Sequence, residues 1–211
     1  MQVAILGTGN VGSGLGKALA AGGHNIVYGV RDPNSPKTMA ALNALGPAAK
    51  VITVAEAVKV GEIIFLAVPW QAVPSVLQSA GELSGKTLVD CTNRPGVPVQ
   101  AGNSSLEEVA RLAPGAHVLK TFNTVAAETL HRPHFGQTKA AMFYGGDEAG
   151  DKATLRRLGE EIGYEMYDLG GLANGYLLDA LFQTWIALAI GNKLGRRLAL
   201  KVLTAQDDRL A

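Results

Sequence analysis

The stretch MQVAILGTGNVGSGLGKALAAGGHNIVYGVR, residues 1–31, contains an apolar strand, a glycine-rich turn, a helix and a second strand. Val3–Leu6 is a short apolar run, as expected of a parallel strand buried on both faces. Gly7, Gly9 and Gly12 follow at the spacing G-x-G-x-x-G. In this pattern the glycines permit a tight turn, the approach of a pyrophosphate to the backbone, and close packing of the helix on the strand.

A helix beginning near Asn10 or Val11 would offer unpaired backbone N–H groups and its positive dipole end to a diphosphate. The glycine spacing alone is weak, because 26 glycines in 211 residues produce it by chance, and a turn that binds nothing is the alternative. Its context strengthens it, since Gly22-Gly23 ends the helix and His24–Gly29 forms a second strand. We therefore expect a dinucleotide site, with Gly12 and Gly16 where the helix touches the sheet.

The end of the second strand indicates which dinucleotide binds. The strand ends in Val30 and Arg31 without a carboxylate, and an arginine at this position suits the 2′-phosphate of NADP. The alternative for Arg31 is a solvated surface side chain. We expect the neighbouring Asp32 to turn outward with Pro33, and Lys37 to add positive charge after a Ser35-Pro36 helix start.

Composition fits one compact body with a sizeable core, since 47% of the residues are hydrophobic and 18% are charged. A net charge of +1 argues against nucleic-acid or membrane-surface binding, which needs a clustered basic excess. The single cysteine, Cys91, excludes an internal disulfide and suits a reducing compartment. The apolar run at the N-terminus is the first strand, so we expect no signal peptide and a cytoplasmic protein.

The rest of the chain alternates strands and helices, which predicts an α/β fold of the Rossmann type with a doubly wound parallel sheet. Ser104-Ser105 before Leu106-Glu107-Glu108 resembles a capping box. The expected helices are residues 36–45, 55–60, 72–83, a helix from 104, and 151–162, and the expected strands are residues 50–54, 62–68, 87–90, 117–119, 140–145 and 164–169.

Ligands bind such sheets at the carboxyl ends of the strands. Val68-Pro69-Trp70, Asn93 and the segment 123–126 follow strands expected beside the first one. Trp70 is either a cover for the cofactor ribose or nicotinamide, or a core aromatic. Asn93 and Asn123 either hold the carboxamide or sugar hydroxyls, or cap their turns.

The C-terminal part reads as a second wall of the site. We expect residues 1–135 to form an NADP-binding domain and residues 136–211 a smaller α/β extension, joined in one compact body. A long terminal helix from Leu172 is apolar on most of its circumference, so it must be buried. We expect it to pack against a second copy in a homodimer, and burial within one subunit is the alternative. Its continuation would carry four cations, which we expect in a solvated helix end, with an anion site as the alternative: Lys193, Arg196, Arg197 and Lys201.

Few residues suggest acid–base, metal or nucleophilic chemistry. His131 and His134 lack further ligands at suitable spacing, and no G-x-S-x-G is present. Cys91 is either a reactive thiol or, as we expect, a small buried residue. Lys120 is the one ionisable candidate near the strand ends, with a solvated lysine as the alternative. We name no catalytic acid or base and no metal ligand.

Several motifs together resemble the family of NADPH-dependent coenzyme F420 reductases. They are G-T-G-N-V-G after the first strand, G-V-R-D-P after the second, L-A-V-P-W after residue 65, K-T-F-N-T at 120–124, G-G-D-E, and a late D-L-G-G-L. The resemblance covers nearly the whole chain, and the oxidoreductase domain of the STEAP metalloreductases is a more distant match.

The resemblance implies an NADPH site that adds Thr8, Val68 and Ala126 to the residues above, and a deazaflavin or flavin acceptor (F420, FMN or FAD) over the C-terminal part. Archaeal members tend to carry a basic residue at the position of Asp32 and a histidine at that of Asn123. The complete expected cofactor site is Gly7, Thr8, Gly9, Asn10, Val11, Gly12, Val30, Arg31, Val68, Pro69, Trp70, Asn93 and Ala126.

The expected reaction is direct hydride transfer between C4 of NADPH and a planar ring stacked on it, which needs alignment and exclusion of water more than a proton donor. Two alternatives stay open. One is a reductase of a small carbonyl or imine compound, in which Lys120 or Tyr176 would have to donate a proton. The other is a non-catalytic module that senses NADP(H).

Overall fold

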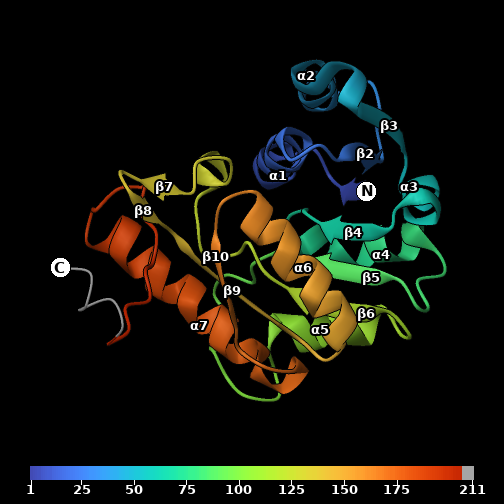
Figure 1. Ribbon diagram of the computed structural model, residues 1–211. Coiled ribbons are helices and arrows are strands. Elements are labelled where there is room, and N and C mark those ends of the chain that lie inside the picture. Colours follow the sequence, from blue (N-terminus) through green and yellow to red (C-terminus); the bar gives the residue numbers. More distant parts are fainter. Residues whose placement is uncertain (206–211) are drawn as a thin grey trace.

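The computed structural model describes residues 1–205, in which eight strands form one sheet of order β10-β9-β6-β5-β4-β1-β2-β3 (Figure 1). The strands are β1 (Gln2–Leu6), β2 (Asn25–Val30), β3 (Ala49–Thr53), β4 (Ile63–Leu66), β5 (Thr87–Asp90), β6 (His117–Lys120), β9 (Ala141–Gly146) and β10 (Glu165–Asp168), with a separate hairpin of β7 (His134–Phe135) and β8 (Thr138–Lys139). The helices are α1 (Asn10–Ala21), α2 (Pro36–Leu45), α3 (Val54–Val60), α4 (Val73–Ala80), α5 (Ser105–Leu112), α6 (Ala149–Glu161) and α7 (Gly175–Ile186). Short helical turns are η1 (Gly46–Ala48), η2 (Trp70–Ala72), η3 (Ala127–Thr129), η4 (Leu172–Asn174) and the π-helical η5 (Ala187–Gly191).

The first six strands are parallel, as the alternating pattern predicts. β9 runs antiparallel to β6, and β10 is parallel to β9. The pairs Leu119↔Gly146 and Lys120↔Gly145 join the carboxyl end of β6 to the end of β9, so the beginning of β9 lies beyond that edge. The extension thus continues the same sheet and adds a wall past the carboxyl ends of the parallel strands.

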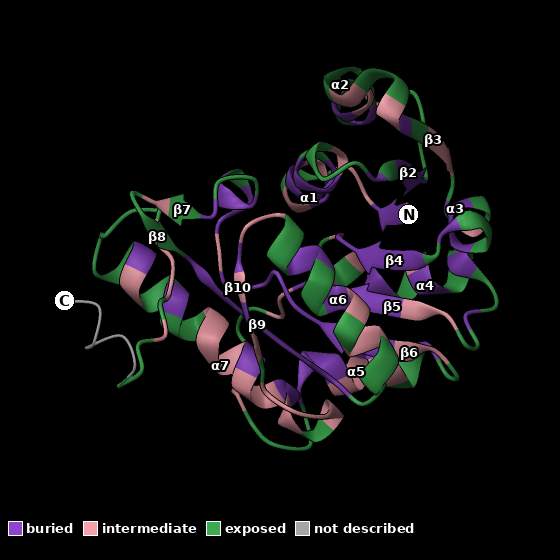
Figure 2. Cartoon of the chain, in the orientation of Figure 1, coloured by how far each residue is buried: buried purple, intermediate pink, exposed green. Residues whose placement is uncertain are grey.

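Helices cover both faces of the sheet, and the strands between them are the most buried part of the chain (Figure 2). On one face, apolar residues of α1, α2 and α6 pack on the sheet in a cluster that includes Leu15, Ala41 and Leu155. On the other face the cluster includes Val58 of α3, Leu77 of α4, and residues of α5 and α7. This is the doubly wound arrangement that the sequence predicts.

Side-chain caps fix where several helices begin. The capping box predicted at α5 is present, because Ser104 Oγ accepts from the Glu107 N–H at 3.1 Å and the Glu107 carboxylate accepts from the Ser104 N–H at 2.8 Å. A second box joins Thr53 and Glu56 at α3. Ser35 caps α2 by accepting from the Thr38 N–H, as its place before Pro36 predicts.

The C-terminal helix is shorter than predicted, and this corrects one expectation. Beyond Ile186 the helix passes into the π turn and ends at Gly191, because Lys193 and Gly195 adopt positive φ angles of 58° and 86° and reverse the chain. The returning segment accepts a hydrogen bond from Trp185 Nε1 at Leu198 O (3.0 Å). The four cations expected on a continued helix therefore lie outside it, namely Lys193, Arg196, Arg197 and Lys201.

The expected burial of this helix holds only in part within one chain. Trp185 and Ala189 are buried, whereas Ile186 and Ile190 are 39% and 53% exposed. Within residues 1–205, no helix combines the length and hydropathy that crossing a membrane requires.

Candidate cofactor-binding site

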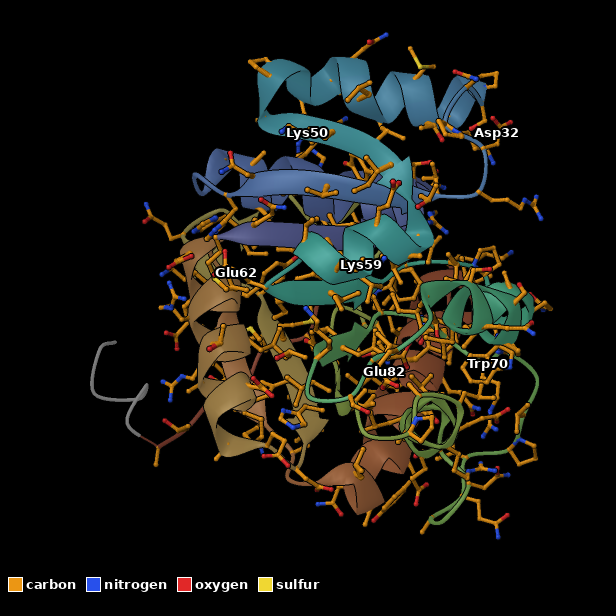
Figure 3. All side chains as sticks on the ribbon, turned by 90° about the vertical axis from the view of Figure 1, so that its right-hand side faces the viewer. Asp32, Lys50, Lys59, Glu62, Trp70 and Glu82 are labelled. Carbon is orange, nitrogen blue, oxygen red and sulfur yellow. The ribbon has the colours of Figure 1, made fainter. Side chains whose placement is uncertain are left out.

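The carboxyl ends of five parallel strands meet at one edge of the sheet. Leu6 is in register with Gly29 and with Leu66, Leu66 with Asp90, and Asp90 with Lys120. The loops that follow these residues therefore leave from neighbouring points, as the sequence predicts. Figure 3 shows this edge on its right, where Asp32 and Trp70 follow β2 and β4, while Glu62, which precedes β4, lies on the left.

The glycine-rich turn after β1 is shaped by two close approaches. Gly7 has a φ of +106°, and a Cβ built there would lie 2.7 Å from Ala67 O of the neighbouring strand end. A Cβ at Gly12 would lie 2.1 Å from Gly7 O, so only glycine lets α1 pack this closely on the turn. Gly16 meets the sheet in the same way, because its Cβ would clash with the hydroxyl of Tyr28.

Gly9 differs from its neighbours. It is exposed, and a Cβ built on it would have no protein atom within 4 Å. Gly9 caps α1 with extended backbone and without a side-chain hydrogen bond to the first turn. The first N–H groups of a helix have no intrahelical acceptor, so this end of α1 is open to an anion. The turn thus fits the diphosphate of a dinucleotide.

A polar network ties this turn to the loop after β2. Thr38, which is 1% exposed, lies with its Oγ1 3.1 Å from Thr8 Oγ1 and donates to Asp32 O at 3.1 Å. The Asp32 carboxylate accepts from the backbone N–H of Asn34 at 3.0 Å and is exposed, so it turns away with its own loop as expected. Arg31 is exposed and makes no ion pair within residues 1–205, which leaves its guanidinium free for a 2′-phosphate.

The loops after β5 and β6 are joined by two asparagines. Asn93 Nδ2 donates to Asn123 O at 3.1 Å, and Asn123 Nδ2 donates to Asn93 Oδ1 at 3.3 Å and to Leu178 O at 2.9 Å. Asn123 Oδ1 is buried with no partner among the described residues, and Phe122 before it has a φ of 57°. Unpaired buried acceptors and strained backbone gather at functional sites, so this segment belongs to the candidate site.

A buried ion pair lies directly beneath these loops. Lys120 and Asp90 are both 0% exposed, and Lys120 Nζ donates to Asp90 Oδ2 at 2.7 Å and to Thr92 O at 2.6 Å. The other oxygen of Asp90 accepts from the N–H and the hydroxyl of Thr92. Lys120 is therefore buried, and the alternative of a solvated lysine is wrong. Its burial also keeps it out of contact with a substrate that needs a proton from the protein.

Arg94 is a site residue that sequence reasoning did not single out. Its guanidinium lies 5.7 Å from the ring centroid of Trp70, pairs with Glu108 at 2.6 Å and donates to Asn103 O. The Arg94 side chain is 9% exposed and its Nε has no partner among the described residues. It holds the segment between β5 and α5 against Trp70, which is only partly buried. The sequence shows that a cation follows Asn93, but it does not show that this cation pairs with Glu108 on α5.

Two other candidate residues are buried. Ala126 is 3% exposed and packs against Trp185 and Ala189. Cys91 is also 3% exposed, and burial raises the pKa of its thiol well above the ordinary value. Cys91 is thus the small buried residue that we expected rather than a reactive thiol.

Metal-binding chemistry finds no support in the described part of the chain. No group of three or more His, Cys, Asp or Glu side chains within residues 1–205 is placed to hold a metal ion. A shallow depression on Glu107, Arg111 and Asp147 lies between α5 and η4 and contains none of the predicted site residues.

The N-terminal part of the chain matches a family of NADP-dependent proteins. Residues 2–94 match the family described as NADP oxidoreductase, coenzyme F420-dependent. The F420-dependent NADP reductase of Methanothermobacter marburgensis is 29% identical over 92% of this chain and 95% of its own length. The metalloreductase STEAP3 of Rattus norvegicus is 31% identical over 85% of this chain, which spans only 36% of that protein.

Two solved structures show how far along the chain the similarity extends. A candidate F420-dependent NADP reductase from Arthrobacter sp. FB24 superposes with a TM-score of 0.82 at 28% identity, covering 96% of this chain and 99% of its own. An imine reductase from Myxococcus stipitatus in complex with NADP+ superposes with a TM-score of 0.66 at 26% identity, covering 92% of this chain and 64% of its own. The resemblance predicted from the motifs is confirmed.

Proposed function

We propose that this chain, whose residues 2–94 match the family described as NADP oxidoreductase, coenzyme F420-dependent, transfers a hydride between NADPH and a deazaflavin or flavin ring. The observation that carries the proposal is the open Gly9 turn beside Arg31, which makes no ion pair among the residues that the structure describes. A backbone cradle for a diphosphate next to a guanidinium for a 2′-phosphate matches the two anionic groups of NADPH.

In this reaction the residues of the chain would bind and orient the reactants, and we assign none of them as a general acid or base. NADPH, when bound, provides the hydride from C4 of its nicotinamide ring. Gly9 and the N-terminus of α1 would hold the diphosphate, and Arg31 the 2′-phosphate. Asn93, Asn123 and the Asp90–Lys120 pair fix the strand ends on which the rings would lie. A hydride-accepting ring needs this alignment and the exclusion of water more than it needs a strong proton donor on the protein.

We propose that the acceptor lies between these strand ends and the wall made by β9, η3 and α7.

Two further proposals concern the assembly of the protein and its place in the cell. The protein would form a homodimer through the apolar side of α7 and η5, where Ile186 and Ile190 remain exposed in the single chain. It would act in the cytoplasm, since its one cysteine suits a reducing compartment.

A reductase of a small imine or carbonyl compound is the second candidate. Its support is the similarity to an imine reductase whose structure holds NADP+. Such a reaction needs a proton donor, and Lys120 is sealed from the surface. Tyr176 on α7 is only partly buried and is the residue that would have to serve.

Stopped-flow oxidation of NADPH, followed at 340 nm with F420, FMN, FAD and a cyclic imine in separate experiments, tests the proposal. We expect rapid oxidation with at least one of the ring acceptors and none with the imine. Gly9→Val is the matched control, because it closes the cradle without touching the acceptor wall. Turnover of the imine alone would favour the second candidate, and inactivity with every acceptor despite NADPH binding would favour a sensor.

A further inference from the structure

A groove runs along α1 from the phosphate-binding turn towards the C-terminal segment. Asn10, Ser13 and Lys17 line it from α1, at intervals of three and four residues that place them on one face of the helix. From Asn10 to Lys17 the helix rises about 10 Å. The opposite side is formed by η3 and the residues after it, and the two sides touch at Gly14, where a Cβ would lie 2.7 Å from Ala127 O.

The groove has the size of a small-molecule site and is continuous with the cofactor cradle. The groove is open to solvent and has a volume of about 610 Å³, which falls in the range of sites that bind small molecules. Asn10, the first residue of α1, belongs both to the groove and to the predicted diphosphate site. A ligand in this groove would therefore adjoin bound NADPH.

The charge of the groove is positive. Lys17 is exposed and makes no ion pair within residues 1–205. The one carboxylate lining the groove, Glu128, is neutralised by Arg196, whose Nε and Nη2 donate to its two oxygens at 2.5 and 3.0 Å. His131 adds a polar side chain, and burial, followed by the charges of Arg132 and Lys17, lowers its pKa. An anion is the ligand that suits this surface.

We propose that the groove binds the anionic chain of the acceptor, a phosphate or carboxylate carried on the side chain of its planar ring, with Lys17 as the principal cation. This inference rests on the proposed function, because it assumes a ring acceptor. It adds a recognition element for the part of the acceptor that takes no part in hydride transfer. Lys17 would then determine which members of the ring family bind well.

Matched acceptors that differ only in the anionic chain test the proposal. FMN and riboflavin differ by one phosphate, and F420 differs from its riboflavin-like core by a phosphorylated acidic chain. With saturating NADPH, Lys17→Ala is expected to raise the KM for the charged member of each pair about threefold to fivefold, and Lys17→Glu about tenfold, as for partly exposed charge pairs. The KM for the uncharged member should change by less than about 1.5-fold.

Two further variants sharpen the test. Lys50→Ala removes an exposed lysine on β3, outside the groove, and should change neither KM (Figure 3). Glu128→Gln removes the negative charge from the groove, so it should lower the KM for the charged acceptor. The dissociation constant of NADPH, measured by fluorescence, should stay unchanged in Lys17→Ala.

The outcomes separate the two proposals. If the wild-type protein oxidises NADPH with none of the four rings, the proposed function fails. If it turns over the uncharged rings but Lys17→Ala leaves the ratio of charged to uncharged KM unchanged, the groove proposal is wrong and the function stands. Weaker binding of NADPH by Lys17→Ala would assign the groove to the cofactor and would also overturn the proposal.

Discussion

The β1–α1 end of the candidate site is built from backbone, whereas the β5–β6 end is built from buried side chains. At the first end, Gly7 and Gly12 allow the turn and helix to approach within a distance that any Cβ would prevent, and Gly9 leaves the helix N-terminus open. At the second end, Lys120 and Asp90 form an ion pair with no exposed surface. The first end is thus suited to hold a ligand, and the second to hold its own loops.

This difference determines what each end tolerates. A turn that binds through N–H groups loses its ligand when a side chain intrudes, yet the fold need not suffer. A buried ion pair gives a large loss of stability when one partner is removed, because the other charge is left uncompensated. Substitutions at the two ends should therefore affect stability and NADPH binding in opposite proportions.

The largest effect on stability is expected at the buried ion pair of Lys120 and Asp90. Lys120→Met leaves the Asp90 carboxylate buried without its cation and should lower the free energy of unfolding by roughly 3–5 kcal/mol. Urea unfolding followed by circular dichroism measures this loss. The double variant Lys120→Met, Asp90→Asn removes the charge while keeping an acceptor for Thr92, and should recover at least about 1 kcal/mol. A single variant as stable as the wild type would contradict the assigned role of the pair.

A substitution at Gly9 should weaken NADPH binding and leave the stability of the fold nearly unchanged. Gly9→Val places a side chain where no protein atom lies within 4 Å, so the melting temperature should stay within about 2 °C of the wild type. The affinity for NADPH should fall on the order of 100-fold, because the diphosphate loses charge-assisted hydrogen bonds to the backbone. Differential scanning fluorimetry and fluorescence titration measure the two quantities. Unchanged NADPH affinity would place the diphosphate elsewhere.

Arg31→Ala should produce a smaller and selective loss. Removal of a guanidinium that pairs with the 2′-phosphate is expected to weaken NADPH binding about tenfold or more and to leave NADH binding within about twofold. Titration of both nucleotides against both proteins gives the comparison. Equal losses for NADPH and NADH would remove the 2′-phosphate role from Arg31.

The smallest effect on stability is expected at the exposed ion pair between Arg196 of the C-terminal segment and Glu128 of η3. Hydrogen bonds from Arg196 lower the pKa of Glu128 to about 2. The stabilisation is therefore present above the ordinary pKa of about 4.5 and is lost as the pH falls towards 2. Both side chains are about half exposed, so Glu128→Gln should cost at most about 1 kcal/mol at pH 7, and less at pH 3. An equal cost at both pH values would exclude the ion pair as its cause.

The backbone-built end could be predicted from the sequence because its determinants lie close together along the chain. Gly7, Gly9 and Gly12 occur within six residues, and the strand and helix around them carry their own periodicity. The cap at Ser35 and the capping box at Ser104 are local signals of the same kind, and both are confirmed.

The side-chain-built end could not be predicted in this way. Lys120 and Asp90 are 30 residues apart, and only the register of β5 with β6 brings them together. Arg94 likewise needs Glu108 and Trp70, which belong to other elements. The helix ends at Gly191 although Leu194 and Leu198 keep an apolar spacing beyond it. Gly191, Asn192 and Gly195 are stop signals in the sequence, whereas the positive φ of Lys193 has none. Long-range pairing and irregular backbone are the parts that a single sequence does not specify.

Transfer of deuterium from labelled NADPH to F420 tests the central claim most directly. NADPH carrying deuterium at C4 on one face or the other is oxidised by the protein in ordinary water, and the reduced F420 is examined by mass spectrometry. Direct hydride transfer within an aligned site predicts that one label is carried fully to the deazaflavin ring and the other stays on the nicotinamide. Oxidation that leaves both labels out of the reduced ring would contradict the account.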